Sequence, residues 1–260
     1  MQEIIKVDQL PIGEKIYFAA DFHLGAPTQK SSLTREKKIV RWLEKISSNA
    51  HIIFILGDIF DFWFEYKHVI PKGFTRLKGK LMELKDAGKE IVFFSGNHDM
   101  WMFDYFQSEF GIPVYRDPQK IIIGNKLFLI GHGDGLGKGD WKYKILKKTF
   151  EIRFTQWAFS RLHPNFGIWF AQKLSDKSRV NNYKHDEEFK GEDEWLLNFC
   201  RQRDKIEHFD YFIFGHRHMT LDLEVSPNSR YINVGEWIED CSYAEFDGND
   251  LHLKYFEKSS

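Results

Sequence analysis

Five short apolar segments along the chain each end at a residue of a type that binds metal, directly or after one glycine. The segments are KIYFAA, HIIFIL, EIVFFS, KLFLI and DYFIF, and they precede Asp21, Asp58, Asn97, His132 and His216. Short apolar runs bounded by turn residues are typical of buried strands. Because ligands of open α/β sheets bind beyond the carboxyl ends of the strands, we expect these residues to meet at one edge. The pattern therefore predicts one polynuclear metal site.

Helical patterns separate the first three of these segments. Two helices are predicted from apolar residues at helical spacing, one at Leu33, Val40, Leu43 and Ile46 and the other at Phe74, Leu77, Leu81 and Leu84. Gly88 is placed to end the second helix. The strands are expected at residues 15–20, 51–56 and 90–95, and strands separated by helices are expected to pair in parallel.

The pattern changes from about residue 114 to shorter, strand-like runs. These runs are KIIIG, KLFLIG, DYFIFG, RYINVG, SYAEF and LHLKYF. Turn signals at Gly124-Asn125 and Asp247-Gly248-Asn249 indicate hairpins. We therefore expect an α/β fold with a two-layer β core, partly parallel and partly antiparallel, flanked by helices.

A basic and aromatic insertion lies between the fourth and fifth segments. Residues 141–184 hold ten Lys or Arg and two acidic residues, and nine aromatic residues, which include Phe154 and Trp169, lie among them over residues 141–170. Pro164 is expected to divide this stretch into two helical parts. An acidic stretch and a helix with Trp195, Leu196 and Phe199 follow, so we predict one domain over residues 1–260 with 141–205 as a helical lid insertion.

Composition restricts the class of protein. The chain has 260 residues and a formal net charge of −1, which fits one domain and argues against a surface built for nucleic acid. Its apolar runs are too short to cross a bilayer, and its first residues lack the pattern of a signal peptide. Cys200 and Cys241 are too few for a disulfide framework, which favours a reducing compartment such as the cytoplasm.

Two short motifs, Asp21-Phe22-His23 and His216-Arg217-His218, each offer a pair of metal ligands. In an extended segment, residues two apart project to the same side, so each pair could hold one metal ion. Asp58 could bridge two cations with its carboxylate. The alternative for each of these segments taken alone is an ordinary polar turn or helix cap.

The glycine turns after the third and fourth strands add an amide oxygen, two imidazoles and two carboxylates. Gly96-Asn97-His98-Asp99 follows one strand, and Gly131-His132-Gly133-Asp134 follows the other. Five of the eleven histidines fall in the five segments, all at equivalent strand ends. This joint occurrence favours a metal site over five unrelated turns.

The ordered set D-x-H, G-D-x-x-D, G-N-H-D, G-H and G-H-x-H, which spans residues 21 to 218, resembles the signature of the calcineurin-like metallophosphoesterases. The resemblance implies a four-layer αββα sandwich with two metal ions. By this resemblance one ion is held by Asp21, His23, Asp58 and His218, and the other by Asp58, Asn97, His132 and His216. It also implies that His98, oriented by Asp99, meets the phosphate as a general acid and that Asp61 supports the metal loop.

Hydrolysis without a nucleophilic side chain is the expected chemistry. Two divalent ions roughly 3.5–4 Å apart lower the pKa of a bridging water toward about 7, so that the bridging hydroxide attacks phosphorus in line. Mixed carboxylate, amide and imidazole ligands without thiolate favour two Mn²⁺ ions, with Fe, Zn or Mg as alternatives.

Further segments, GDIFDFWFEY, GNHDMWMFDYF and HGDGLGKGD, resemble those of UDP-2,3-diacylglucosamine pyrophosphohydrolases of lipid A biosynthesis. This resemblance implies a glycolipid nucleotide substrate cleaved to UMP and 2,3-diacylglucosamine 1-phosphate, and a cytoplasmic enzyme peripherally associated with the inner membrane. Two departures concern the substrate: the family's best-known members carry Arg where this chain has His98, and a Leu-Cys-Thr-Asp-Asp stretch where it has Leu136 to Asp140. Either Arg or His can stabilise phosphate charge.

The insertion is consistent with a lipid substrate, because its aromatics offer apolar surface for acyl chains and its cations attract pyrophosphate or an anionic membrane. The alternative interpretation of the insertion is a helical hairpin whose aromatic side chains pack on the core. The expected substrate contacts are Asp140, Arg153, Phe154, Trp169, Ser178, Arg179, Asn182 and Lys184.

Two other functions stay open from the sequence. One is a metallophosphoesterase for another ester, in a nucleotide, a nucleic acid or a phosphoprotein, since a basic aromatic lid can also stack bases. The other is an inactive scaffold with the same fold, which should have lost metal ligands. The sequence leaves the oligomeric state undetermined.

Overall fold

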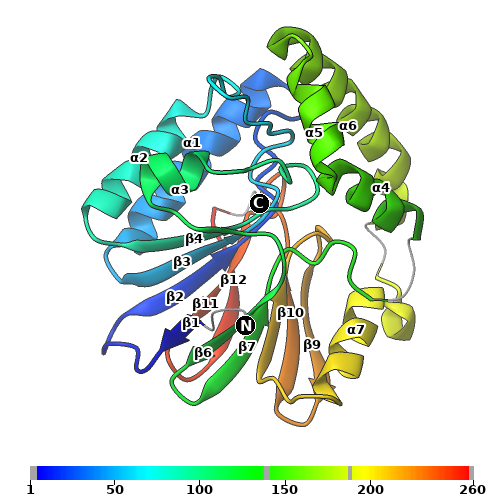
Figure 1. Ribbon diagram of the computed structural model, residues 1–260. Helices are drawn as coiled ribbons and strands as arrows, with labels where there is room; N and C mark the ends of the chain where they lie inside the picture. The colour runs from blue at the N-terminus through cyan, green and yellow to red at the C-terminus, as the bar shows by residue number, and fades with distance from the viewer. Residues whose placement is uncertain (1–4, 138–140, 187–188, 258–260) are drawn as a thin grey trace.

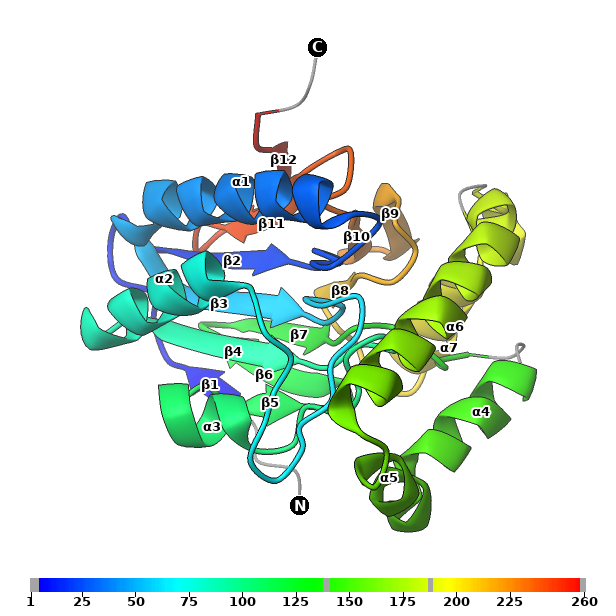
Figure 2. The ribbon, with the colours of Figure 1, turned by 90° about the horizontal axis from the view of Figure 1, so that it is seen from above.

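The computed structural model describes residues 5–137, 141–186 and 189–257, except for the side chains of residues 141–143 and 176–186. Two six-stranded sheets face each other, and helices cover both outer faces (Figure 1). This is the four-layer αββα arrangement that the sequence predicts. It places the strand ends that carry the polar residues at one side of the molecule (Figure 2).

The first sheet contains the three strands of the helix-separated part of the chain. Its strand order is β12-β11-β2-β3-β4-β5. Strands β2 to β5 are parallel, whereas β11 runs antiparallel to both β2 and β12. The strands span Lys15–Ala19 (β2), Ala50–Leu56 (β3), Glu90–Phe94 (β4), Val114–Tyr115 (β5), Ser242–Phe246 (β11) and Leu251–Tyr255 (β12).

The second sheet has the order β1-β6-β7-β8-β10-β9. The predicted turn at Gly124-Asn125 joins β6 and β7 as an antiparallel hairpin, and β7 and β8 are parallel. Two of its strands, β1 and β9, have no counterpart in the sequence prediction. The strands span Ile5–Val7 (β1), Gln119–Ile123 (β6), Lys126–Ile130 (β7), Tyr211–Phe214 (β8), Thr220–Ser226 (β9) and Ser229–Val234 (β10).

Aromatic side chains fill the space between the two sheets. Phe18 of β2 stacks on Phe54 of β3 and on Phe128 of β7, with ring centroids 5.3 and 6.4 Å apart. All three rings are fully buried. Burial of each such side chain contributes about 1.5–3 kcal/mol, so this layer fixes the sheets against each other.

Helices α1 (Gln29–Ser47), α2 (Thr75–Asp86) and α3 (Tyr105–Phe110) cover the first sheet, and α7 (Trp195–Asp204) covers the second. The buried face of α1 differs in part from the prediction, since Leu33 is exposed and Arg35 and Glu36 are buried. Glu36 accepts hydrogen bonds from the backbone N–H groups of Arg76 and Leu77. It thereby caps α2, whose own N-cap residue, Phe74, makes no such bond.

Three helices stand beside the sandwich where β2 and β3 point (Figure 2). They are α4 (Trp141–Glu151), α5 (Arg153–Ser160) and α6 (Pro164–Asp186). Pro164 begins α6 as the sequence predicts, but the part before it is divided again at Ile152, whose backbone is extended. A short 3₁₀ turn, η1 (Gly191–Asp193), leads on to α7.

The proposed boundaries of the lid insertion, residues 141–205, include α7. The buried residues Leu196, Leu197 and Cys200 pack α7 against the second sheet, so α7 is part of the sandwich. We therefore use the word lid for α4, α5 and α6 alone. Among the described residues, no helix is long and apolar enough to cross a membrane.

Candidate metal centre

Five loops bring the predicted ligands together at the carboxyl ends of five strands. Three of these strands, β2, β3 and β4, belong to the first sheet, and β7 and β8 belong to the second. The site therefore lies across the junction of two sheets, not along the edge of one. The ligand side chains on these loops are Asp21, His23, Asp58, Asn97, His132, His216 and His218.

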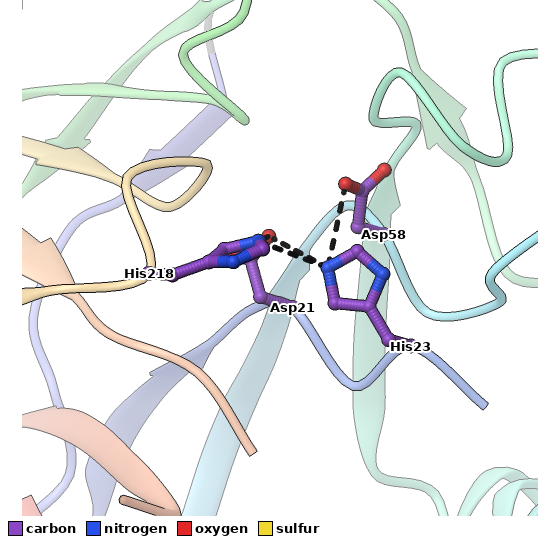
Figure 3. A group of neighbouring side chains, drawn as sticks. All are labelled: Asp21, His23, Asp58 and His218. Atoms are coloured by element: carbon purple, nitrogen blue, oxygen red, sulfur yellow. Dashed lines mark hydrogen bonds and ion pairs between the residues drawn. The ribbon is translucent and has the colours of Figure 1, made fainter. Parts of the chain in front are cut away.

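The first predicted set of ligands forms a compact group (Figure 3). Asp21, His23, Asp58 and His218 each present one ligand atom, and these atoms all lie within 4.8 Å of one another. The His218 Nε2 atom lies 3.3 Å from Asp21 Oδ1, and His23 Nε2 lies 3.7 Å from Asp58 Oδ2. Three of the four side chains are fully buried, so the group is shielded from water on most sides.

The second set gathers around His132. Its Nε2 atom lies 3.5 Å from Asp58 Oδ2 and 3.1 Å from Asn97 Oδ1. The ring of His216 lies edge-on to that of His132, with centroids 5.0 Å apart. Since the same oxygen of Asp58 faces both His23 and His132, this carboxylate is placed between the two groups, as a bridging ligand requires.

The backbone that presents these ligands is not extended, contrary to the expectation for the D-x-H and H-x-H motifs. Asp21, His23, His216 and His218 all have positive φ angles, between 43° and 69°. Asp58, at 50°, shares this conformation. Non-glycine residues adopt it at a cost, and such strained positions cluster at functional sites. The paired ligands therefore converge through tight left-handed turns and not through strand alternation.

Two glycines allow the loops to approach each other closely. A Cβ atom at Gly96 would lie 2.2 Å from Asp58 Oδ1, and one at Gly215 would lie 2.5 Å from Asp21 Oδ2. Both oxygens accept hydrogen bonds from the next loop: Asp58 Oδ1 from the His98 N–H and Asp21 Oδ2 from the His216 N–H. The glycines thus permit hydrogen bonds that orient the carboxylates.

Burial and neighbouring charges shift the pKa values of three histidines in the site. Burial lowers the pKa of His23, but its contacts with Asp21 and Asp61 outweigh burial and raise the pKa to about 10. Burial likewise opposes ionisation of His132, whereas the Asp58 carboxylate raises its pKa to about 10. The pKa of His216 is lowered to about 4, by burial and then by the charge of His132. Without metal, protonated His23 and His132 supply the positive charge that the buried carboxylates require.

The residues fit divalent cations. Asp21 Oδ1 is buried and accepts no hydrogen bond within the described part of the chain. Nearby, the Nε2 atoms of His23 and His218 face each other at 3.0 Å. A buried carboxylate oxygen without a donor, beside convergent imidazole nitrogens, is what a cation site requires. The chain is therefore suited to hold divalent metal through these loops.

His98 contacts a different residue from the one that the sequence suggests. The two oxygens of Asp99 accept hydrogen bonds from the backbone N–H groups of Gly96 and Ile59, each at 2.7 Å, and the role of Asp99 in orienting His98 stays a prediction. The Nδ1 atom of His98 instead lies 3.0 Å from the carbonyl oxygen of Asp61. Asp99 braces the two loops after β3 and β4, and burial followed by the charge of Asp58 raises its pKa to about 7.

Asp61 lies behind the ligands, where the sequence places it. Its Oδ1 atom is 3.7 Å from His23 Nδ1 and 3.8 Å from His98 Nδ1. One carboxylate thus faces the outer nitrogen of a metal-binding imidazole and the ring expected to meet phosphate. At these distances the carboxylate acts on both rings through its charge and not through a hydrogen bond.

The sequence analysis misses two buried arginines that hold the ligand loops. Arg35 of α1 donates hydrogen bonds to the carbonyl oxygens of Phe22, His23 and Ala26, at 2.5 to 2.6 Å. Arg217, between two ligands, pairs with Glu194, with Nε 2.9 Å from Oε1, and both are buried. The available signal for Arg35 was a charged residue one turn before Ile39 on the apolar face of α1.

Seven of the eight expected substrate contacts belong to helices of the lid. Arg153 and Phe154 are exposed on α5, and Trp169 is exposed on α6. Ser178, Arg179, Asn182 and Lys184 also belong to α6, but their side chains lie outside the described residues, as does Asp140 altogether. Roles in substrate binding stay predictions for all eight residues.

The fold and the ligand set define a class of enzyme. Residues 14–220 match the family model described as calcineurin-like phosphoesterase, and the chain belongs to this family. It is a metal-dependent phosphoesterase, and the retained ligand residues remove the basis for the inactive-scaffold alternative.

Particular relatives are similar over nearly the whole chain. A UDP-2,3-diacylglucosamine hydrolase of Porphyromonas gingivalis is 36% identical over 94% of this chain and 98% of its own length. Another protein of that name, from Actinobacillus succinogenes, is 28% identical over 92% of this chain and 99% of its own length. Among solved structures, Yfce, a phosphoesterase from E. coli, matches with a TM-score of 0.45 and 15% identity over 94% of this chain and 95% of that chain.

Proposed function

We propose that this enzyme hydrolyses the pyrophosphate of UDP-2,3-diacylglucosamine and releases UMP and 2,3-diacylglucosamine 1-phosphate. The observation that carries the proposal is the convergence of seven ligand side chains at Asp58, beside His98 and beneath a lid with exposed aromatic residues. The names of relatives that match end to end support the same substrate.

Each metal would be held by one of the two groups. Asp21, His23, Asp58 and His218 would bind one ion, and Asp58, Asn97, His132 and His216 the other. When bound, the two ions would activate water for attack on phosphorus and neutralise phosphate charge. Mn²⁺ is the proposed metal, because the ligands combine carboxylate, amide and imidazole without thiolate.

His98 is proposed to meet the substrate phosphate. Its Nδ1 side is occupied by the Asp61 carbonyl oxygen, which leaves Nε2 as the atom that can donate to substrate. If attack occurs at the UMP phosphorus, the leaving group is a phosphate monoester that needs little protonation. His98 would then act chiefly by stabilising charge, the role that an arginine also serves.

The lid is proposed to receive the acyl chains. Phe154, Trp157, Phe166 and Trp169 are each about half exposed or more, which supports this proposal, whereas Phe150 and Phe159 pack on Trp101 as the alternative interpretation of the insertion expects. Lys173 lies over the ring of Trp169, at 4.6 Å from its centroid. Apolar rings edged with cations suit an acylated, anionic substrate and a membrane surface. We infer a cytoplasmic enzyme at the inner membrane.

A substrate panel tests the proposal. Purified protein loaded with Mn²⁺ should hydrolyse UDP-2,3-diacylglucosamine with much higher kcat/KM than bis(p-nitrophenyl) phosphate or single-stranded DNA. Chromatography of the products should show UMP. Preference for the diester or for DNA would instead favour a metallophosphoesterase that acts on another ester.

The bridging ligand has its own test. Asp58→Ala should lose at least one of the two metal ions per chain, measured by elemental analysis after gel filtration, together with turnover. Asp8→Ala, at an exposed carboxylate paired with Lys6, serves as the control and should leave both unchanged. Two retained ions and full turnover in Asp58→Ala would show that Asp58 does not bridge.

A further inference from the structure

A serine of the lid touches His98. Ser175 lies on α6, and its Oγ atom is 3.0 Å from His98 Nδ1. The same Oγ atom lies 3.4 Å from Asp61 Oδ2 and 3.5 Å from the Asp61 carbonyl oxygen. One hydroxyl from a helix of the lid therefore meets both the imidazole and the residue that holds it, across 77 positions of sequence.

The partners of Nδ1 determine how the imidazole is held. A backbone carbonyl oxygen only accepts hydrogen bonds, so Nδ1 must carry a proton in order to bond to Asp61. The Ser175 hydroxyl can accept from the same N–H and donate to Asp61. Together they fix the plane of a ring that otherwise contacts His23 only edge-on, at 4.9 Å between centroids.

The lid touches the His98 loop at a second point. The indole Nε1 of Trp101, three residues beyond His98, donates to the carbonyl oxygen of Phe150 on α4, at 2.9 Å. Trp101 also packs against Phe159 of α5, with ring centroids 4.8 Å apart. The loop after β4 is thus the part of the metal site against which all three lid helices rest.

We propose that Ser175 is a positioning residue that makes His98 competent only while α6 rests on the site. The hydroxyl does not touch substrate; it orients the imidazole so that Nε2 faces the phosphate. The inference rests on the proposed role of His98 in the phosphoester hydrolysis. It gives the lid a part in the chemical step beyond holding acyl chains.

The test is a double-mutant cycle with Ser175→Ala and His98→Ala. Ser175→Ala removes one hydrogen bond to the ring, so kcat should fall about 5- to 10-fold in the otherwise unchanged protein. KM should change little. In the His98→Ala background the serine substitution should have no further effect. Ser175→Thr, which keeps the hydroxyl, should restore most of the activity.

A matched control comes from the same lid. Ser160 bonds to the carbonyl oxygen of Trp157 within its own helix, so Ser160→Ala removes a lid hydroxyl away from the site and should leave kcat unchanged. Equal losses from Ser175→Ala in both backgrounds, or no loss in either, would overturn the inference and leave Ser175 a structural residue.

A second readout does not depend on turnover. Because coupling between two contacting groups is reciprocal, His98→Ala should speed amide hydrogen exchange in residues 164–175 while leaving residues 29–47 of α1 unchanged. Unchanged exchange in α6 would also overturn the inference. Failure of the unmodified enzyme to cleave UDP-2,3-diacylglucosamine would instead refute the proposed function alone, since the cycle can be measured on bis(p-nitrophenyl) phosphate and exchange needs no substrate.

Discussion

Glycines decide how closely the loops of the predicted ligands can meet, and Gly215 is one of them. Its missing Cβ leaves room for Asp21 Oδ2 and for the Ala20 side chain, each of which would lie 2.5 Å from an added methyl group. That distance is far below van der Waals contact, and the neighbours are the carboxylate of a predicted ligand and a fully buried residue directly after β2. Metal binding and packing therefore depend on the same glycine.

Gly215→Ala should abolish binding of at least one ion and lower the melting temperature, as measured by elemental analysis and calorimetry. Gly79→Ala is the matched control, because Gly79 lies within α2 and an added Cβ meets no atom within 4 Å. That change should raise the free energy of unfolding by about 0.5–1 kcal/mol and leave the metal content unchanged. Full metal content in Gly215→Ala would contradict the close approach of these loops.

Proton release should accompany metal binding. His23 and His132 have pKa values of about 10 without metal, so each is protonated at pH 7.5 and must lose its proton to bind a cation. His216, with a pKa of about 4, releases none. Apparent metal affinity should therefore rise with pH up to about 10, and calorimetry in buffers of different ionisation enthalpy should detect the released protons.

The stability of the metal-free fold should depend on pH in the opposite direction to the metal affinity. Both pKa values lie above the ordinary histidine value of about 6.5, so protonation stabilises the metal-free fold fully below pH 6.5. This stabilisation should be lost as the pH rises through about 10, which denaturant titrations of chelator-treated protein can measure. A metal affinity independent of pH would show that the two rings are already neutral.

Candidate site residues could be predicted where the same local pattern recurs along the chain. They could not be predicted where a contact joins segments that are far apart in the sequence. All seven predicted ligands follow from apolar strands that end in Asp, Asn or His, because that pattern is local in the sequence, and the structure brings them to one place. The partner of His98 was missed because Asp61 and Ser175 reach it from other segments. The carboxylate of the adjacent Asp99 instead accepts hydrogen bonds from the backbone N–H groups of Ile59 and Gly96.

At the scale of elements, the N-terminus of α7, which follows the lid, contacts the loop that carries His216 and His218. Glu194, the N-cap residue of α7, pairs with Arg217, and the adjacent Trp195 ring lies edge-on to that of His216 at 5.9 Å. Buried ion pairs add little net stability but are costly to break, since one charge is left without its partner. The pair therefore specifies where α7 starts relative to the ligands.

Arg217→Met should lower the free energy of unfolding by about 3–5 kcal/mol, because the Glu194 carboxylate would stay buried without this partner. Urea titration measures the loss. The double variant Arg217→Met with Glu194→Leu should recover a large part of it. Arg41→Met breaks an exposed pair with Glu257 and should cost less than about 1 kcal/mol. Equal losses in the free energy of unfolding for Arg217→Met and Arg41→Met would show that burial of the ion pair is unimportant.

Element prediction succeeded where periodicity was strong. The hairpins at Gly124-Asn125 and Asp247–Asn249 and the helix capped near Gly88 are all present. Strands β1 and β5 were missed because they have three and two residues, too few to show a period. Strand β9 was missed although its sequence, TLDLEVS, alternates polar and apolar residues as a half-buried edge strand does.

At the scale of the whole molecule, the predicted metal ligands and the proposed acyl-binding surface belong to different parts, the sandwich and the lid. The predicted metal ligands lie on loops of the two sheets, whereas five exposed aromatic residues, Phe154, Trp157, Phe166, Trp169 and Phe170, lie on α5 and α6. Each buried methylene of an acyl chain contributes about 0.8 kcal/mol, so a few lid contacts would dominate affinity for a diacylated substrate. Substitutions in the lid should then distinguish binding from hydrolysis.

Phe154→Ala combined with Trp169→Ala should lower kcat/KM for UDP-2,3-diacylglucosamine at least about tenfold. Hydrolysis of bis(p-nitrophenyl) phosphate should be unchanged. Because both rings are exposed, the melting temperature should shift little. Ile206→Ala, at an exposed apolar residue outside the lid, is the control. Equal loss of both activities in the folded variant, or loss of neither, would refute an acyl-binding lid.

The order of the ligands along the chain has a consequence for biosynthesis. The first ligand is Asp21 and the last is His218, and the last two come from a loop that follows the entire lid. A chain still emerging from the ribosome holds the first sheet's ligands, but it lacks His216 and His218 until its final quarter is made. If His216 and His218 are metal ligands as predicted, complete metal binding is a late event, and prematurely terminated chains should lack hydrolytic activity.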